Sequence, residues 1–334
     1  MTTQHAVLET REVQSYKNRN LDFAETIAQL SRGEFYARSD SLLHNDISIF
    51  RRRSSQTVFE SGKFPDNHTA IFFYDSENSV YVKGRYYGKG GISSLRANDN
   101  WKTVTRKDAA VYAIILRNDC LHRYFDQPQL DDFTYFVNYQ HGGTSNDKNG
   151  QAPVFRIINR AFDYLQRKIV NVNDEVFLQN IRDDIMYFLG SLLSTMDYDL
   201  LRVNSKAKLV DRTLEVIHSS PLHDLKVSDI AKELHTNRRN IEIAFGQYLG
   251  ISPKEYIINL KLNAIRMDLL SVPIYQKSIS QIAKSHGIVH MGNFSKAYFN
   301  LFHENPSQTR KQALNLLART TTQKDSIAAL ANVN

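Results

Sequence analysis

The sequence contains a single cysteine, Cys120, and no run of eighteen apolar residues. One cysteine cannot form an internal disulfide, and a lone thiol fits a reducing compartment. Without a long apolar run, no membrane-spanning helix is expected. The first twenty residues are polar and of mixed charge, and they lack the apolar segment of a secretory signal. These absences predict a cytoplasmic protein that does not bind a membrane.

The N-terminal half also lacks the residue patterns of common metal and phosphate sites. The histidines His44, His68, His122 and His141 are scattered, and no His-x-His pair occurs in this half. Zinc sites need clustered ligands, so no metal is expected. The stretch GRYYGKGG at 84–91 does not have the spacing of a phosphate-binding loop. We therefore predict no cofactor, no catalytic constellation and no enzyme activity.

The chain does have positive charge, and it is confined to one part. Residues 1–203 hold 25 Lys and Arg against 25 Asp and Glu, so their charges cancel. Residues 204–318 hold 15 Lys and Arg against 9 acidic residues, which accounts for most of the net charge of +7. Localised positive charge is typical of proteins that bind polyanions such as nucleic acids. A basic surface that only faces solvent is the alternative.

Short β-rich runs fill the chain from about residue 46 to 117. They are rich in Val, Ile, Tyr, Phe and Thr, and turn residues separate them. Two stretches with apolar residues at helical spacing follow, at 155–169 and 178–196. These helices could pack on the β domain or pair with another subunit. We predict an α+β protein whose domain 1–200 is a β-rich barrel or sandwich, cupin-like, with two helices.

Two segments in the basic part follow one plan, and both begin with Ile-Ala-Lys, at Ile230 and Ile282. In the first, a short helix breaks near His235, and Asn237 is a good N-cap for a second helix. Two short helices joined by a tight turn form a helix-turn-helix, whose second helix can enter the DNA major groove. The residues exposed early in that helix suit base edges: Arg238, Arg239, Asn240 and Glu242.

The second segment repeats the arrangement, with Gly287 at the turn, where a positive φ is expected. The residues that we expect to face DNA here are Val289, His290, Met291, Asn293 and Lys296. The alternative is that Met291 is partly core and that His290 is merely exposed.

Between the two segments, Ser252 is a cap and Pro253 begins a helical stretch without a breaker before Pro273. Residues 253–270 as one helix would span about 27 Å. This roughly matches a DNA turn of about 34 Å, so the two units can enter successive major grooves on one face. We predict an all-α domain at 201–318, with two helix-turn-helix units on a linker helix, and a flexible tail at 319–334.

Residues 204–318 resemble the DNA-binding domain of the AraC/XylS family of bacterial transcription regulators. The resemblance rests on Asn237-Arg238-Arg239, Phe245, LGISPKEYI and GIVHMGNFSKAYFNLFHENPS. VHMGNF is also similar to a pattern in the ethanolamine-utilisation regulators of this family. His303 stands where the family usually has glycine, which predicts a final turn without positive φ. The resemblance implies that one helix of each unit contacts double-stranded DNA, often beside a promoter and near RNA polymerase.

The resemblance also implies an N-terminal domain that binds a small-molecule effector and forms a homodimer. The candidate effector-binding residues are Phe72, Tyr74, Tyr81, Lys83 and Trp101, although aromatic residues of this kind are more often core. The run Arg51-Arg52-Arg53 alternates between strand faces, which suggests a solvated or interface edge. We predict an activator controlled by an effector. A ligand-independent regulator, whose N-terminal domain serves only dimerisation or polymerase contact, is the alternative.

Overall fold

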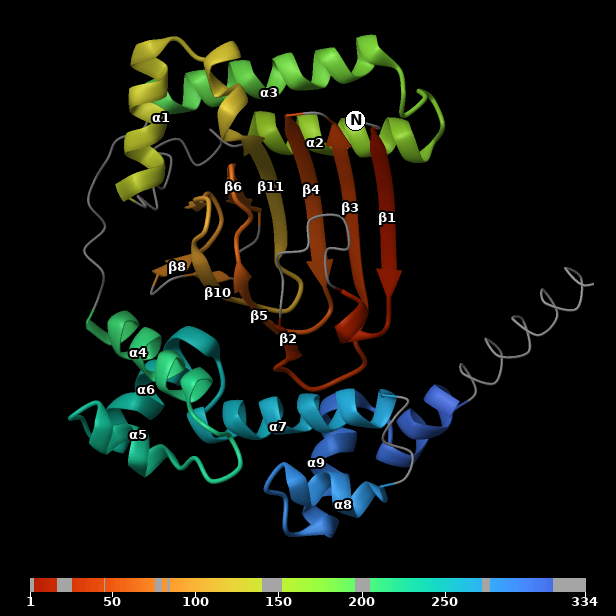
Figure 1. Ribbon diagram of the computed structural model, residues 1–334, viewed down its shortest axis with the longest axis vertical. Helices are drawn as coiled ribbons and strands as arrows, with labels where there is room; N and C mark the ends of the chain where they lie inside the picture. The colour runs from red at the N-terminus through yellow and green to blue at the C-terminus, as the bar shows by residue number, and fades with distance from the viewer. Residues whose placement is uncertain are drawn as a thin grey trace, which may run out of the picture.

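The computed structural model shows a β-rich domain with one group of helices packed on it and a second, C-terminal group at its opposite end (Figure 1). It describes residues 3–16, 26–44, 46–75, 80–82, 85–139, 152–195, 205–271 and 277–314. The predicted tail at 319–334 lies outside these residues. The predicted α+β class, with a β-rich N-terminal part and a helical C-terminal part, is confirmed.

The described strands form two antiparallel sheets. Sheet A has, in spatial order, β1 (Gln4–Thr10), β3 (Ala37–His44), β4 (Ile47–Ser54), β11 (Ala110–Arg117), β6 (His68–Tyr74) and β9 (Ile92–Leu95). Sheet B has β2 (Thr26–Gln29), β5 (Val58–Lys63), β10 (Asn100–Thr105), β7 (Val80–Val82) and β8 (Arg85–Tyr87). Trp101 of sheet B packs against Phe50 and Ile115 of sheet A, so the two sheets enclose a common interior.

The sheets begin at residue 4, well before the predicted start near residue 46. Strand β3 shows why the sequence concealed this. Its Asp40 is almost fully buried and accepts hydrogen bonds from Arg51 (2.9 Å), Gln166 (2.7 Å) and Arg38 (3.1 Å). A buried carboxylate that is paired in this way is tolerated in the fold. It nevertheless interrupts the apolar alternation by which a strand is recognised.

Three helices cover the outer face of sheet A: α1 (Gln127–Tyr139), α2 (Ala152–Gln166) and α3 (Glu175–Thr195) (Figure 1). Helices α2 and α3 correspond to the two predicted helices, and α1 is an additional one. The side chains of Phe136, Phe162 and Ile185 are fully buried in one core with Phe73 and Ile114 of the sheet. The sequence left open whether these helices pack on the β domain or on another subunit, and in this chain they pack on the β domain.

The regular elements among the described residues of the C-terminal part are all helices. Its elements are α4 (Ser205–Ser219), α5 (Val227–Glu233), α6 (Arg238–Leu249), α7 (Pro253–Leu270), α8 (Ile279–Ser285) and α9 (Met291–Phe302), followed by a helical stretch at 306–314. Helix α7 belongs to two cores at once. Tyr256 and Leu260 pack with α4, α5 and α6, whereas Ile265 and Leu269 pack with α8 and α9. The two units therefore lie at opposite ends of one helix (Figure 1).

Sheet B packs directly on the first of these units. The ring of Phe59 on β5 stacks on His218 of α4, with ring centroids 4.3 Å apart and planes 11° apart. His218 also lies 2.9 Å from the hydroxyl of Tyr256 on α7. Tyr81 on β7 donates from its hydroxyl to a carboxylate oxygen of Asp211 on α4, at 3.4 Å. The β domain and the first unit therefore share one core.

The second unit is held by the edge strand β2. The backbone N–H of Gln29 donates to Oδ1 of Asn263 on α7 (3.0 Å), and Nδ2 of Asn263 donates back to the Gln29 carbonyl (2.9 Å). Nε2 of Gln29 donates to the carbonyl of Leu301, near the end of α9 (2.6 Å). Arg266 on α7 pairs with Glu12 of the β domain (2.8 Å) and with Glu304. Both units are thus fixed to the β domain.

The imidazole of His218 makes the stability of this interface depend on pH. Burial lowers its pKa to about 4, from 6.5 for the free group. Between these values the unfolded chain binds a proton that the folded chain does not, so the free energy of unfolding falls as pH falls from 7 to 5. His218→Gln should reduce this slope by up to about 1.4 kcal/mol per pH unit, measured by urea unfolding. An unaltered slope in His218→Gln would show that His218 is not the source of this pH dependence.

Candidate nucleic-acid interface and barrel cavity

Helices α5 and α6 form the first helix-turn-helix. Helix α5 ends at a turn in which His235 has a φ of 49°. The side chain of Asn237 then accepts a hydrogen bond from the backbone N–H of Asn240 (2.8 Å), so the predicted N-cap is present. Helix α6 buries Ile241 and Phe245 against the rest of the unit. Its opposite face is left exposed to solvent.

The predicted base-contacting residues of α6 lie on this exposed face. Arg238, Arg239 and Asn240 are exposed and Glu242 is half-buried. Nε of Arg238 donates to Glu242 Oε1 at 2.7 Å, so these two side chains neutralise each other one turn apart. Arg239 has no ion pair among the described residues. Arg239 and Asn240 are therefore the side chains that can meet a base edge without breaking an ion pair.

Helices α8 and α9 form the second unit. Ser278 and Gln281 make a reciprocal capping box at the start of α8, and Gly287 has the expected positive φ, 74°. Of the predicted residues, Val289, His290, Asn293 and Lys296 are exposed. Met291 is half-buried and packs against the core of this unit, in agreement with the alternative considered for it.

The turn after α9 differs from its prediction. Because His303 stands in place of glycine, the left-handed conformation was not expected here, yet His303 adopts it with a φ of 54°. Its ring stacks on Phe299, with centroids 5.7 Å apart and planes 5° apart. The backbone N–H of His303 also donates to the Phe299 carbonyl (2.8 Å), which closes the helix. The geometry of the helix end therefore overrides the preference of the residue type.

Two exposed apolar side chains on these helices were not predicted as site residues. Ile243 on α6 is 46% exposed and Phe299 on α9 is 45% exposed. Ile243 lies four residues after Arg239, so it shares that side of the helix. An apolar side chain there can contact a thymine methyl group. The helical spacing from Arg239 was the signal that could have identified it.

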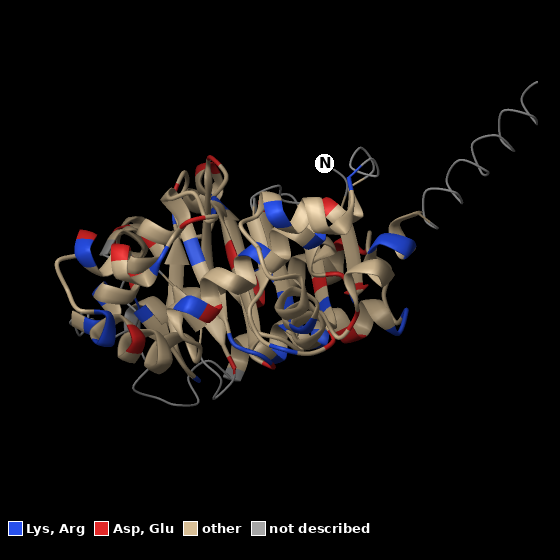
Figure 2. Ribbon diagram, turned by 90° about the horizontal axis from the view of Figure 1, so that it is seen from below, with Lys and Arg blue, Asp and Glu red and all other residues tan. Residues whose placement is uncertain are grey.

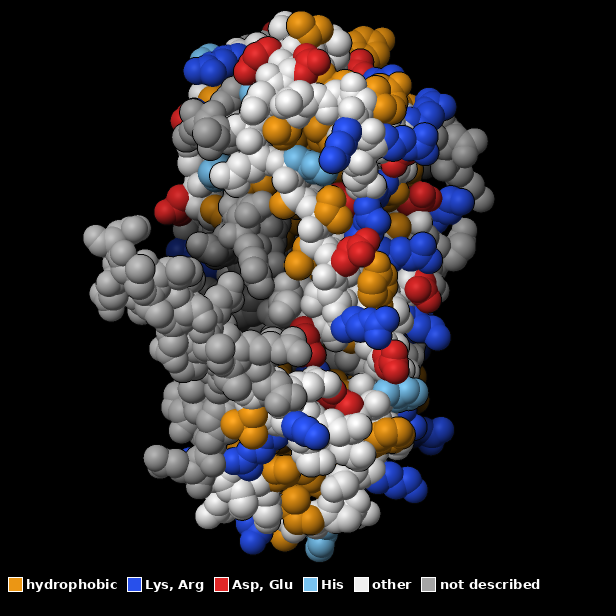
Figure 3. Space-filling model, turned by 90° about the vertical axis from the view of Figure 1, so that its right-hand side faces the viewer, with side chains coloured by type: hydrophobic (Ala, Val, Ile, Leu, Met, Phe, Trp, Pro, Cys, Tyr) orange, Lys and Arg blue, Asp and Glu red, His pale blue; other side chains and the backbone are white. Residues whose placement is uncertain are grey.

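Charge is distributed differently over the two parts of the molecule. Figure 2 looks onto the C-terminal helices and shows Lys and Arg over both units. The exposed cations there include Arg239, Lys254, Lys284 and Lys296. Figure 3 shows the side that carries β1, where cations and acids alternate. On strands β3 and β1, Nη1 of Arg38 pairs with Oε1 of Glu9 at 3.0 Å.

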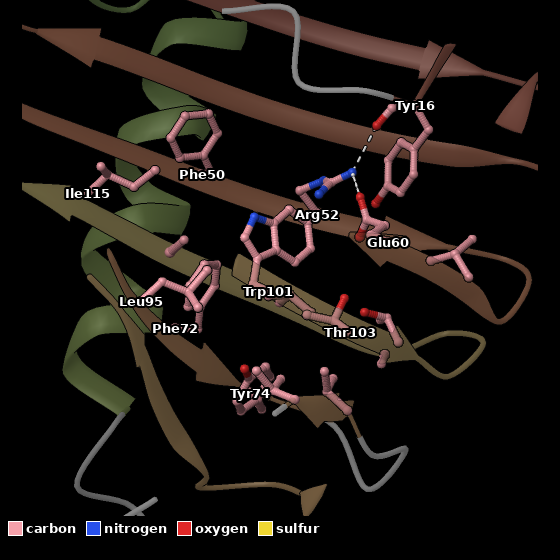
Figure 4. Close-up of a pocket in the computed structure, with 17 residues that line it drawn as sticks. Tyr16, Phe50, Arg52, Glu60, Phe72, Tyr74, Leu95, Trp101, Thr103 and Ile115 are labelled. Atoms are coloured by element: carbon pink, nitrogen blue, oxygen red, sulfur yellow. Dashed lines mark hydrogen bonds and ion pairs between the residues drawn. The ribbon is translucent and has the colours of Figure 1, made fainter. Parts of the chain in front are cut away.

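A cavity of about 70 Å³ lies between the two sheets of the β domain (Figure 4). Three of the predicted effector-binding residues, Phe72, Tyr74 and Trp101, line it. Tyr81 does not, because it points from the other face of β7 toward α4. Lys83 lies outside the described residues. The cavity therefore contains only part of the predicted effector-binding set.

One end of this cavity is polar, and its main residue was misjudged from the sequence. Arg52 is not at a solvated edge: it points into the barrel, where its Nη2 donates to Glu60 Oε1 (2.9 Å) and to the Tyr16 carbonyl (2.9 Å) (Figure 4). Its guanidinium lies 4.2 Å from the centre of the Tyr16 ring. Burial raises the pKa of Tyr16 to about 12, so this phenol is neutral. The alternation within the Arg51-Arg52-Arg53 run was the available signal.

Sheet B separates the cavity from the first helix-turn-helix unit by a single layer. Along β5, Val58 and Glu60 line the cavity while Phe59 packs on α4 and α7. Strands β7 and β10 alternate in the same way, because side chains of successive residues point to opposite faces. In these strands Val80, Val82, Thr103 and Thr105 line the cavity, and Tyr81 and Val104 join the core of the first unit. A shift of sheet B would therefore change both the cavity and the contact with the first helix-turn-helix unit.

Within the described residues, no group of three or more His, Cys, Asp or Glu side chains is placed to hold a metal ion. Cys120 is buried. A search of the described helices finds none with the length and apolar character to cross a membrane.

Comparison with known proteins finds similarity in the C-terminal part. Residues 230–312 match a family described as a helix-turn-helix domain. The XylDLEGF operon transcriptional activator of Pseudomonas putida is 30% identical over 102 residues, which are 30% of this chain and 32% of that protein. The Msm operon regulatory protein of Streptococcus mutans is 35% identical over 113 residues, which are 34% of this chain and 40% of that protein.

Among solved structures, a transcriptional regulator with an AraC-type DNA-binding domain from Chromobacterium violaceum is similar to 33% of this chain and 96% of its own, with 31% identity and a TM-score of 0.29. The chain spans 32% of the length of the P. putida protein and 40% of the length of the S. mutans protein.

The turn glycine of the second unit provides a test of this geometry. Gly287 has a φ of 74°, and an added Cβ would lie 2.5 Å from the carbonyl oxygen of His223. Gly287→Ala should lower the free energy of unfolding by more than about 1 kcal/mol. Gly246→Ala is the control, because no atom lies within 4 Å of its added Cβ. Gly246 lies inside α6, so Gly246→Ala should raise the free energy of unfolding by about 0.5–1 kcal/mol. Thermal unfolding of both variants measures the difference, and equal effects would contradict the turn geometry.

Proposed function

We propose that this chain, which belongs to the AraC/XylS family of transcription regulators, binds double-stranded DNA in a sequence-specific manner through its two helix-turn-helix units. The observation that carries the proposal is the pair of exposed helix faces held at opposite ends of α7. Helix α7 runs from Pro253 to Leu270, or about 27 Å, which is close to the about 34 Å of one DNA turn. The two units would then enter successive major grooves on one face.

Within this proposal the site residues take distinct roles. Arg239 and Asn240 would contact base edges from α6, because Arg suits guanine and Asn suits adenine. Asn293 would do the same from α9. The surrounding cations, Lys296 among them, would contact phosphates and supply affinity that depends on salt. We assign DNA binding to residues 201–318.

We assign effector binding and homodimerisation to residues 1–200. The cavity between the sheets is the proposed effector site, and sheet B is the element through which an occupied cavity would act on the DNA-binding units. We propose that the chain is an activator in the cytoplasm that works with RNA polymerase, since the similar P. putida protein is named an activator. In the alternative, the N-terminal domain only forms the dimer or contacts polymerase, and no ligand enters the cavity.

The proposal is tested by binding the full-length protein to its own upstream DNA, in a gel shift and a footprint at several salt concentrations. We expect protection of two successive major grooves per chain that survives excess nonspecific DNA. Protection that disappears equally for all sequences as salt rises would overturn sequence-specific binding, because a purely electrostatic surface behaves in this way.

Base contacts and phosphate contacts are distinguished by a pair of variants. Arg239→Ala should cost about 1–3 kcal/mol of binding free energy at one operator position and relax the preference there. Lys296→Ala should weaken binding to all sequences alike and reduce the salt slope by about one. Both are measured by titration against operators with single base changes. A uniform loss in Arg239→Ala would show that Arg239 does not contact a base.

A further inference from the structure

The cavity between the sheets has two chemically different ends. Figure 4 shows Phe50, Phe72, Leu95 and Ile115 gathered at one end and Arg52 at the other. These apolar side chains come from β4, β6, β9 and β11, all strands of sheet A. A molecule in the cavity would therefore bury most of its surface against hydrocarbon, which favours an apolar body.

The polar end carries almost no net charge. Arg52 and Glu60 form an ion pair at 2.9 Å, and the side chain of Glu60 is only 7% exposed. An anionic ligand would add a second negative charge beside Glu60, and a cationic ligand would add a second positive charge beside Arg52. Either would bury a charge without a counter-ion, which is strongly unfavourable.

Arg52 carries a hydrogen-bond donor at this end that Glu60 and Tyr16 do not use. Nε of Arg52 is buried and has no hydrogen-bond partner in the described part of the chain. A buried donor without a partner is costly, so an acceptor placed there would be bound favourably. The Nη2 atom is already occupied by Glu60 and the Tyr16 carbonyl. The Nε–H of Arg52 is thus left as a donor for an acceptor on a ligand.

We propose that the cavity binds a small, uncharged, mainly apolar molecule with an acceptor, such as an amide or ketone oxygen, that faces Nε of Arg52. This inference rests on the proposed function, because it specifies the effector of that function.

The size of the cavity connects binding to regulation. Its volume of about 70 Å³ is roughly half that of an apolar cavity of about 150 Å³ that accommodates benzene. A ligand of ring size must therefore displace part of the wall. Val58, Val82 and Thr105 belong to the wall formed by sheet B, and the opposite face of that sheet packs on α4 and α7. Ligand entry therefore acts on the contact between the β domain and the first helix-turn-helix unit.

The experiment uses three probes with one branched carbon skeleton: isovaleramide, isovalerate and isoamylamine. Their binding to the full-length protein is measured by thermal shift and calorimetry. We expect isovaleramide to raise the melting temperature, and the two charged probes to bind about tenfold or more weakly. Equal or tighter binding of isovalerate or isoamylamine would overturn the assignment to an uncharged ligand.

Two variants test the site itself. Glu60→Gln removes the counter-ion of Arg52 and should reverse the preference, so that isovalerate binds more tightly than isovaleramide. Ala113→Leu fills the cavity from β11, where Ala113 is buried in its lining, and should abolish binding of all three probes. Retained binding of isovaleramide in Ala113→Leu would place the ligand elsewhere. If Glu60→Gln does not fold, the ranking of the probes on the unchanged protein still tests whether the ligand is uncharged. Ala113→Leu still tests whether the ligand lies in the cavity.

DNA binding is measured in parallel by gel shift without probe. Failure of isovaleramide to bind the unchanged protein, with sequence-specific DNA binding intact, contradicts the ligand assignment alone. Absence of sequence-specific DNA binding contradicts the proposed function, whatever the probes do. If no probe binds the unchanged protein at millimolar concentration, the inferred ligand class is wrong.

Discussion

The hydrogen bonds between Asn263 and the backbone of Gln29 are the interaction on which the rest of the arrangement depends. Strand β2 is an edge of sheet B, and Asn263 satisfies both its N–H and its carbonyl in the way that a neighbouring strand would. Asn259 adds a bond to the Leu30 carbonyl at 2.8 Å. Each such bond contributes only about 1 kcal/mol to stability, but leaving the buried groups unpaired would cost more. Helix α7 is therefore fixed in register on the β domain.

Because α7 is shared, fixing it fixes both units. Tyr256 at one end and Ile265 farther along the helix belong to the separate cores of the two units. The β domain also contacts each unit directly, through Phe59 on α4 and through Gln29 at the end of α9. The cavity lies one strand layer away from the first of these contacts. A change in the cavity and a change in the position of the helices are thus mechanically connected.

The parts that could be predicted from the sequence are those determined by local chemistry. The caps at Asn237 and Ser252 and the turn at Gly287 follow from single residue types and were found where expected. The early strands and the inward-pointing Arg52 were missed, because their polar residues are buried with partners on other elements: Arg51 and Gln166 for Asp40, and Glu60 for Arg52. Tyr81 was predicted to line the effector site but points toward α4, because the face on which a strand residue lies depends on the register with neighbouring strands. Residue identity alone does not reveal these pairings.

The most direct test of this account is the spacing that α7 imposes on DNA. The full-length protein would be titrated against its mapped operator, and against the same operator with about five or ten base pairs inserted between the two protected grooves. If α7 is a rigid spacer held by the β domain, both insertions should remove the contribution of one unit. Five base pairs turn the second groove away, and ten move it about one DNA turn farther along. Undiminished binding to either insertion would show that the units move independently, which would contradict the account.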